Sequence, residues 1–166
     1  MTQITKTSLV AASSEQVWDL LAAFDAISSW AKNVDHSSLL TTLNGGVGAA
    51  RRVQVGRLAL IESVTVWETM NELAYSIQGL PPVVKSVTNQ WRMTSRGADT
   101  EVSLTTLIDP GGAPRGKIAA AVLGAVLGRA SLQMLKGMQA SVNKGSVPSA
   151  GVLSGAIPQA MVAPKL

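Results

Sequence analysis

The stretch "PRGKIAAAVLGAVLGRASLQMLKGMQASVN", residues 114–143, predicts one long helix near the end of the chain. Its apolar residues recur at helical spacing and include Ile118, Val122, Ala125, Leu132, Leu135 and Val142. Four glycines interrupt the pattern: Gly116, Gly124, Gly128 and Gly137. Because an apolar face of this extent needs cover, we expect the helix to lie across a sheet. The glycines, which cost a helix about 1 kcal/mol each, then allow close packing or leave room for a ligand.

The residues before this helix alternate between apolar and polar side chains. From Val34 to Asp109, turn signals at "NGGVG", "VGR", "MNE", "GLPP" and "RGADT" separate six strands. The segment "ITKTSLVAA" (4–12) predicts a seventh. Between them, "SSEQVWDLLAAF" (13–24) and "DAISSWA" (25–31) predict two short helices. This order predicts an α+β fold, in which a seven-stranded curved antiparallel sheet surrounds the long C-terminal helix and the two short helices follow strand 1.

Length and composition indicate one domain. With 166 residues, 46% of them apolar and 14% charged, the chain can bury a sizeable core. We assign residues 1–144 to this domain and residues 145–166, which show neither period, to a flexible tail. The chain has no cysteine and one histidine, His36, so neither disulfides nor a cysteine or histidine metal site is expected. We expect no metal and no cofactor.

Several partner classes are disfavoured. "GGAPRGKI" (111–118) has the glycines and lysine of a phosphate-binding loop, but Ile118 stands where a Mg²⁺-binding hydroxyl is needed. The net charge of +4 is scattered, so no nucleic-acid surface is expected. The N-terminus lacks a secretory signal, which favours a cytoplasmic location. The longest apolar run, residues 118–128, is shorter than the ~20 residues of an integral membrane segment. We expect a monomer or homodimer.

Three stretches resemble the START-like helix-grip superfamily: "SSEQVWDLLAAFDAISSW" (13–30), "GVGAARRV" (46–53) and "LIESVTVWETMNELAYSI" (60–77). That superfamily includes bacterial polyketide cyclase/dehydrase and lipid-transport proteins, and the resemblance covers roughly residues 3–144. It implies a mostly apolar cavity between the sheet and the C-terminal helix. A small hydrophobic molecule would bind there, such as a lipid, a polyketide or another aromatic compound.

The resemblance also implies ligand-binding residues. It directs the side chains of Arg51, Glu62 and Tyr75 into the cavity, and it places Asp35 where some relatives anchor a ligand. Trp30 is expected beside the cavity mouth. The strand 83–95 can be placed with either of its two faces toward the cavity. The resemblance directs its short polar side chains inward: Ser86, Thr88 and Gln90. Burial of its large side chains favours the opposite face: Val87, Trp91 and Met93.

Glu62 is also singled out by its surroundings. If it points inward, period two places four apolar neighbours of its strand on the same face: Leu58, Leu60, Val64 and Val66. A carboxylate in such a wall must be paired or protonated, and Arg51 on the neighbouring strand is the obvious partner. The two form either a ligand anchor or a purely structural pair.

Three functions are compatible with these features. The first is binding of a small hydrophobic ligand, which needs only a cavity and a few orienting polar groups. The second is a polyketide cyclase/dehydratase-like enzyme that uses Glu62 or Tyr75 as acid or base. The third is a protein-interaction or toxin-like module. The sequence names neither the ligand nor a reaction.

Overall fold

The structure is a computed structural model that describes residues 1–145 apart from residues 81, 83 and 113. Seven strands form one sheet: β1 (Thr2–Val10), β2 (His36–Leu39), β3 (Ala50–Val55), β4 (Leu58–Glu68), β5 (Glu72–Gln78), β6 (Ser86–Arg96) and β7 (Asp99–Asp109). The helices are α1 (Ser14–Ala22), the 3-10 helix η1 (Phe24–Ser29) and α2 (Pro114–Asn143). Except for Gly145, the predicted tail of residues 145–166 lies outside the described residues.

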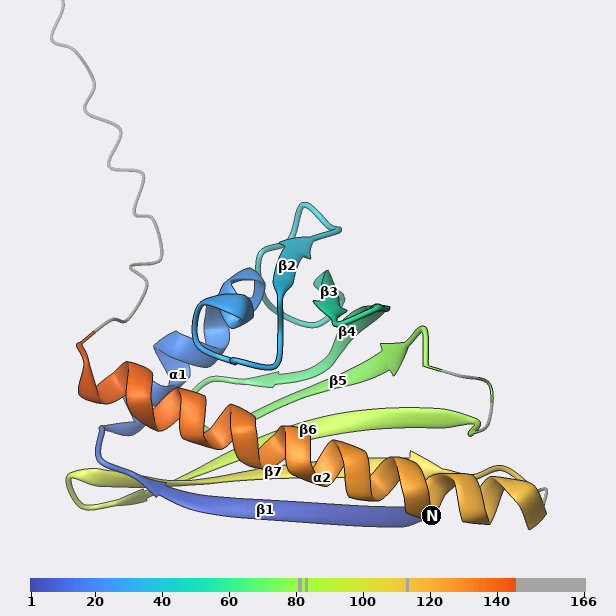
Figure 1. The fold of residues 1–166 in the computed structure, drawn as a ribbon. Coiled ribbons are helices and arrows are strands. Elements are labelled where there is room, and N and C mark those ends of the chain that lie inside the picture. Colours follow the sequence, from blue (N-terminus) through green and yellow to red (C-terminus); the bar gives the residue numbers. More distant parts are fainter. Residues whose placement is uncertain (81, 83, 113, 146–166) are drawn as a thin grey trace, which may run out of the picture.

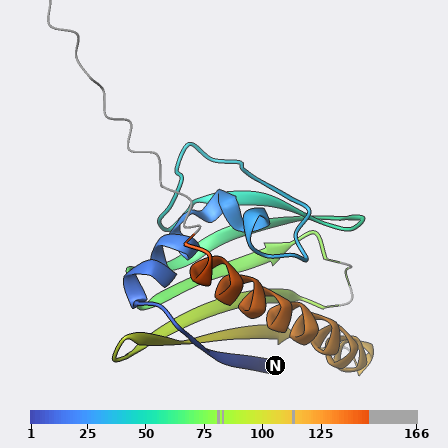
Figure 2. The ribbon, with the colours of Figure 1, turned by 60° about the vertical axis from the view of Figure 1, so that its left-hand side comes forward.

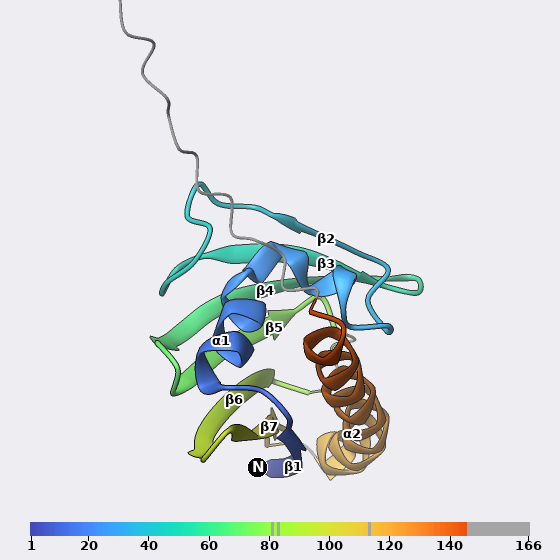
Figure 3. The ribbon, with the colours of Figure 1, turned by 90° about the vertical axis from the view of Figure 1, so that its left-hand side faces the viewer.

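The sheet is antiparallel throughout, in the order β1-β7-β6-β5-β4-β3-β2. Strands β2 to β7 form the predicted meander, and β1 pairs with β7, with Thr2 opposite Ile108. Helix α2 lies across the sheet in Figure 1, and Figure 3 shows the sheet curling around α1 and α2. The predicted α+β helix-grip architecture is confirmed.

The first helix begins at a capping box. Ser13 Oγ accepts a hydrogen bond from the Gln16 backbone N–H, and Gln16 Oε1 accepts one from the Ser13 N–H. One side of α1, including Trp18 and Leu21, is buried in the core. The second predicted helix is the 3-10 helix η1, which begins at Phe24 without a side-chain cap.

The apolar positions named for α2 pack on the core in its second half, where Leu135 is buried, but not in its first half. Large apolar side chains predicted to face the sheet are exposed instead, with Ile118 at 71% and Val122 at 63%. Small residues face β1 in their place, and a Cβ added at Gly124 would lie 2.7 Å from Cδ1 of Ile4. Small residues allow a helix to approach a sheet more closely than large ones. Close packing therefore explains this glycine.

The second half of α2 is held differently. Met134, Leu135 and Met138 are buried in the core. A Cβ at Gly137 would overlap the backbone carbonyl of Trp30, so the helix contacts the chain after η1 directly. By length and composition, the span Arg115–Asn143 is apolar enough to cross a membrane. Its contacts with β1 and β7 account for it as the core helix of the domain.

Strand β4 contains a bulge that the sequence analysis did not predict. The pairing with β5 shifts between Val64 and Val66. Before the bulge, Leu60, Glu62 and Val64 are buried on the inner face, as expected. After it, Trp67 rather than Val66 points inward and packs edge-on against Trp18 of α1, with ring centroids 5.1 Å apart.

Candidate functional site

A partly enclosed cavity of about 160 Å³ lies between the concave face of the sheet and α2. Strands β3, β4 and β5 and helix α2 supply most of its apolar wall. Five polar residues interrupt that wall: Asn33, Glu62, Asn89, Thr106 and Ser131. A mostly apolar pocket with a few polar groups is the usual form of a small-molecule site.

Arg51 and Glu62 form a buried ion pair beside this cavity. They lie opposite each other on β3 and β4 and are only 3% and 5% exposed. Glu62 Oε2 accepts a hydrogen bond from Arg51 Nε at 2.6 Å, and Arg51 Nη2 lies 2.6 Å from the same oxygen in the ion pair. Arg51 also donates to the carbonyl of Phe24, and its guanidinium carbon lies 3.9 Å from the centroid of the Phe24 ring. Arg51 is thus fixed by a carboxylate, a carbonyl and an aromatic face.

The two oxygens of Glu62 differ in their surroundings. Oε2 makes both contacts with Arg51, whereas Oε1 makes no hydrogen bond to any other described residue. An ionised carboxylate can accept about four hydrogen bonds, so its capacity is not filled. Glu62 therefore adds an unfilled acceptor to a wall that is otherwise largely apolar.

Tyr75 anchors a second polar network behind the wall. Its hydroxyl accepts hydrogen bonds from Asn89 Nδ2 at 3.4 Å and Trp91 Nε1 at 3.3 Å, and Thr106 Oγ1 donates to Asn89 Oδ1 at 2.7 Å. Burial, reinforced by the negative charge of Glu62, raises the pKa of Tyr75 to about 12. The phenol is neutral at physiological pH and does not line the cavity.

Comparison with known proteins identifies the family. The family model described as "Polyketide cyclase / dehydrase and lipid transport" matches residues 1–142. The chain belongs to this family. No curated protein sequence matches it.

Two solved structures show the same fold as this polyketide cyclase/dehydrase family member. The Zhui aromatase/cyclase from Streptomyces sp. R1128 is similar with a TM-score of 0.72 and 20% identity, over 91% of this chain and 99% of that one. A START superfamily protein from Mycobacterium smegmatis is similar with a TM-score of 0.69 and 15% identity, over 87% and 99%. At such identities the likeness establishes the fold alone. The START-like resemblance seen in the sequence is confirmed.

In this family member, Arg51, Glu62 and Tyr75 lie close together. The resemblance directed all three side chains into the cavity, but only Glu62 lines it. Arg51 lies behind it, and its guanidinium carbon is 5.2 Å from the centroid of the Tyr75 ring. Among the described residues of the wall, Glu62 is the only side chain that ionises.

Trp30 and Asn33 each carry a polar atom without a partner in the described part of the chain: the indole Nε1 and the amide Oδ1. Trp30 is buried and packs edge-on against Trp91, with centroids 6.1 Å apart, but it does not line the cavity. Asn33 does line it. The sequence analysis missed Asn33, which lies between η1 and β2 where no periodic pattern assigns a face.

Three further predicted ligand-binding residues also lie outside the cavity wall. Ser86 is exposed and Thr88 lies half-buried on the outer face of β6, since the frame that buries the large side chains is the one adopted. That frame brings Asn89 into the cavity wall instead. Asp35 is exposed, and its carboxylate accepts a hydrogen bond from the Gly56 N–H at 2.7 Å. This hydrogen bond stabilises the turn between β3 and β4.

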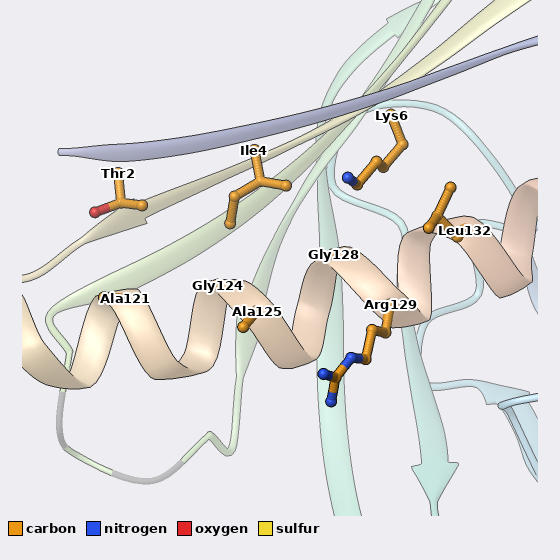
Figure 4. A pocket seen from close by; sticks show the side chains of 9 residues that line it. All are labelled: Thr2, Ile4, Lys6, Ala121, Gly124, Ala125, Gly128, Arg129 and Leu132. Carbon is orange, nitrogen blue, oxygen red and sulfur yellow. The ribbon is translucent and has the colours of Figure 1, made fainter.

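A shallow groove of about 280 Å³ lies between β1 and α2. Figure 4 shows Thr2, Ile4 and Lys6 projecting from β1 toward the helix, while Arg129 extends away from that strand. The groove is larger than the cavity, but it is open and its helix side consists mostly of small residues. The more enclosed cavity is the better ligand site. Among the described residues, no three His, Asp or Glu side chains gather closely enough to hold a metal ion.

Proposed function

We propose that this family member binds a small hydrophobic molecule carrying a hydroxyl group in the cavity between the sheet and α2. The hydroxyl donates a hydrogen bond to Glu62 Oε1, and the apolar wall holds the body of the ligand. The observation that carries the proposal is a carboxylate oxygen without a partner among the described residues, on a side chain of an apolar cavity wall.

The volume favours a compact ligand. A cavity of roughly 150 Å³ lined by aliphatic and aromatic side chains is known to accept benzene, and the present one measures about 160 Å³. A monocyclic phenol therefore fits. A polyketide or lipid would place one ring or one chain segment inside and extend past the mouth, where Leu58 and Val126 are exposed.

The polar groups favour a ligand that donates hydrogen bonds. Glu62 Oε1 and Asn33 Oδ1 are both acceptors that lack donors among the described residues. An unsatisfied buried polar atom such as Asn33 Oδ1 costs about 1–3 kcal/mol, and a hydrogen bond to a charged group such as Glu62 contributes more than one between neutral groups. A ligand hydroxyl that reaches either acceptor therefore gains affinity over an apolar ligand of the same shape.

The test compares p-cresol with toluene by calorimetric titration. Both have the same ring and methyl group, but only cresol has a hydroxyl. We expect the protein to prefer cresol by roughly tenfold or more, the effect of a hydrogen bond to a charged group. The double variant Arg51→Met/Glu62→Leu replaces the buried pair by apolar groups, a change that proteins often tolerate. It should lose the preference for cresol, because an apolar wall leaves the buried hydroxyl without a partner.

Single variants separate the ligand anchor from the structural pair. Arg51→Met alone leaves a buried carboxylate unpaired and should lower the free energy of unfolding by about 3–5 kcal/mol. Glu62→Gln keeps the shape and should lower cresol affinity more than toluene affinity. If the wild type binds neither compound, or if the cresol preference survives in the double variant, Glu62 is not the anchor.

The geometry supports binding better than catalysis. A cyclase or dehydratase needs a proton donor or acceptor in contact with the substrate. Tyr75 lies outside the cavity wall, and burial raises its pKa to about 12. Glu62 is therefore the one candidate for an acid–base role in the described wall, and its carboxylate is held by Arg51. Turnover of a poly-β-keto substrate that is lost in Glu62→Gln would favour the enzyme instead.

A further inference from the structure

Four large aliphatic side chains of α2 are exposed to solvent. They form the outer stripe: Ile118, Val122, Val126 and Leu132. Three of them are four residues apart, a spacing that places side chains next to each other on a helix. Large aliphatic groups that gather on one exposed face mark an interaction surface more often than isolated ones do.

The charges on α2 are all positive. Arg115, Lys117, Arg129 and Lys136 lie on the helix, which contains no acidic residue. Within the described part of the chain, none of these four forms an ion pair. The asymmetry extends along the sequence, because residues 110–166 contain six of the 14 Lys and Arg residues and none of the 10 Asp and Glu residues.

From this combination we infer that the outer stripe and its flanking cations dock on an anionic lipid bilayer. Aliphatic side chains insert at the boundary between headgroups and acyl chains, and Lys and Arg contact the negatively charged headgroups. A helix that carries both kinds of side chain on its exposed surface and lacks acids complements such a surface in polarity and in charge.

The same charges disfavour a second copy of the chain as the occupant. A two-fold dimer brings the same patch of both subunits together. Such a dimer through the outer stripe would place the cations of one α2 near those of the other, and like charges brought together across an interface cost affinity. An anionic bilayer has no such penalty.

Docking would also bring the cavity mouth to the membrane. Val126 belongs to the outer stripe and lines the cavity, together with the exposed Leu58. Figure 2 shows the turn between β3 and β4 and the first turns of α2 on the same side of the molecule. Next to Leu58, Arg57 adds a further exposed cation, while the carboxylate of Asp35 is engaged by the turn amide of Gly56.

The test measures flotation of the full chain with vesicles at physiological ionic strength. One set contains phosphatidylcholine alone, and the other contains equal parts of phosphatidylcholine and phosphatidylglycerol. We expect binding to the anionic set that weakens with added salt. Val122→Glu should weaken it at least tenfold, and Lys117→Gln by about fivefold.

A matched control distinguishes the outer stripe from exposed apolar surface in general. Val47, in the loop between β2 and β3, is 63% exposed, the same fraction as Val122. Val47→Glu should leave vesicle binding unchanged. The inference is overturned if the wild type floats with neither set, if both sets bind it equally, or if the two Val→Glu variants behave alike. It is also overturned by a dimer that Val122→Glu dissociates in the absence of vesicle binding.

The outcome of the vesicle assay does not depend on the outcome of the cresol assay. The vesicle assay depends on the outer surface of α2, whereas the cresol assay depends on Glu62 inside the cavity. Val122 and Lys117 do not line the cavity, so their variants should bind cresol as the wild type does. The proposal of a docking surface therefore does not depend on the proposed ligand.

Discussion

Alkaline pH should destabilise this protein through one side chain. Tyr75 is the only tyrosine in the chain and is completely buried. Burial, followed by the nearby charge of Glu62, raises its pKa from 10.0 to about 12. The folded protein therefore holds the phenolic proton more tightly than the unfolded chain does.

The sign and size of the effect follow from this difference. Below about pH 10 the phenol is protonated in both states, so its contribution to stability is fully present. Between pH 10 and about 12 the unfolded state loses the proton first, and stability falls as the pH rises. A difference of about two pKa units corresponds to about 3 kcal/mol, all of which is lost above the folded-state pKa.

The measurement uses the fact that only Tyr75 can form a tyrosinate. Its near-ultraviolet absorbance should appear about two pH units higher in the native protein than in denaturant. Urea unfolding across this pH range should show the loss of stability, and Tyr75→Phe should remove that component while leaving the lysine and arginine titrations in place. A native tyrosinate midpoint near 10, with circular dichroism still that of the folded state, would refute the reasoning.

Four further predictions concern stability and the corrected site. Gly137→Ala should cost on the order of 3 kcal/mol in urea unfolding, because a Cβ there overlaps the carbonyl of Trp30. Gly128→Ala in the same helix, where the nearest atom would be 3.4 Å from the new Cβ, should instead stabilise by up to about 1 kcal/mol. Ser13→Ala removes the capping box of α1 and should cost about 1 kcal/mol in the same assay. Asp35→Ala should leave cresol affinity unchanged in calorimetry, and a loss there would restore Asp35 to the site.

The element order was predictable because its signals are local. Turn residues separate the strands, and the apolar spacing of residues 114–143 gives the long helix its observed bounds. The capping pair at the start of α1 is also a short-range pattern. Each depends on neighbours within a few positions, so one sequence contains enough information.

The faces of the elements were less predictable because they depend on distant partners. On β6, burial of Trp91 decided the frame against the resemblance, so Asn89 entered the cavity wall while Ser86 and Thr88 did not. Asn89 lies two residues before Trp91 and therefore on the same face of the strand, and this spacing was the signal from which the sequence could have identified it. On α2, the glycines rather than the large aliphatic residues face β1, because the distance between helix and strand decides which side chains fit.

The uneven anchoring of α2 has a kinetic consequence. Its first half contacts the sheet through small residues such as Ala120 and Gly124, which bury little apolar area, whereas Met134 and Met138 fix its second half in the core. Local opening should therefore be easiest in the first half, and its amides should exchange their hydrogens fastest. Because Leu123, Val126 and Leu127 of this half line the cavity, its opening would give a ligand a route of entry that leaves the rest of the fold closed.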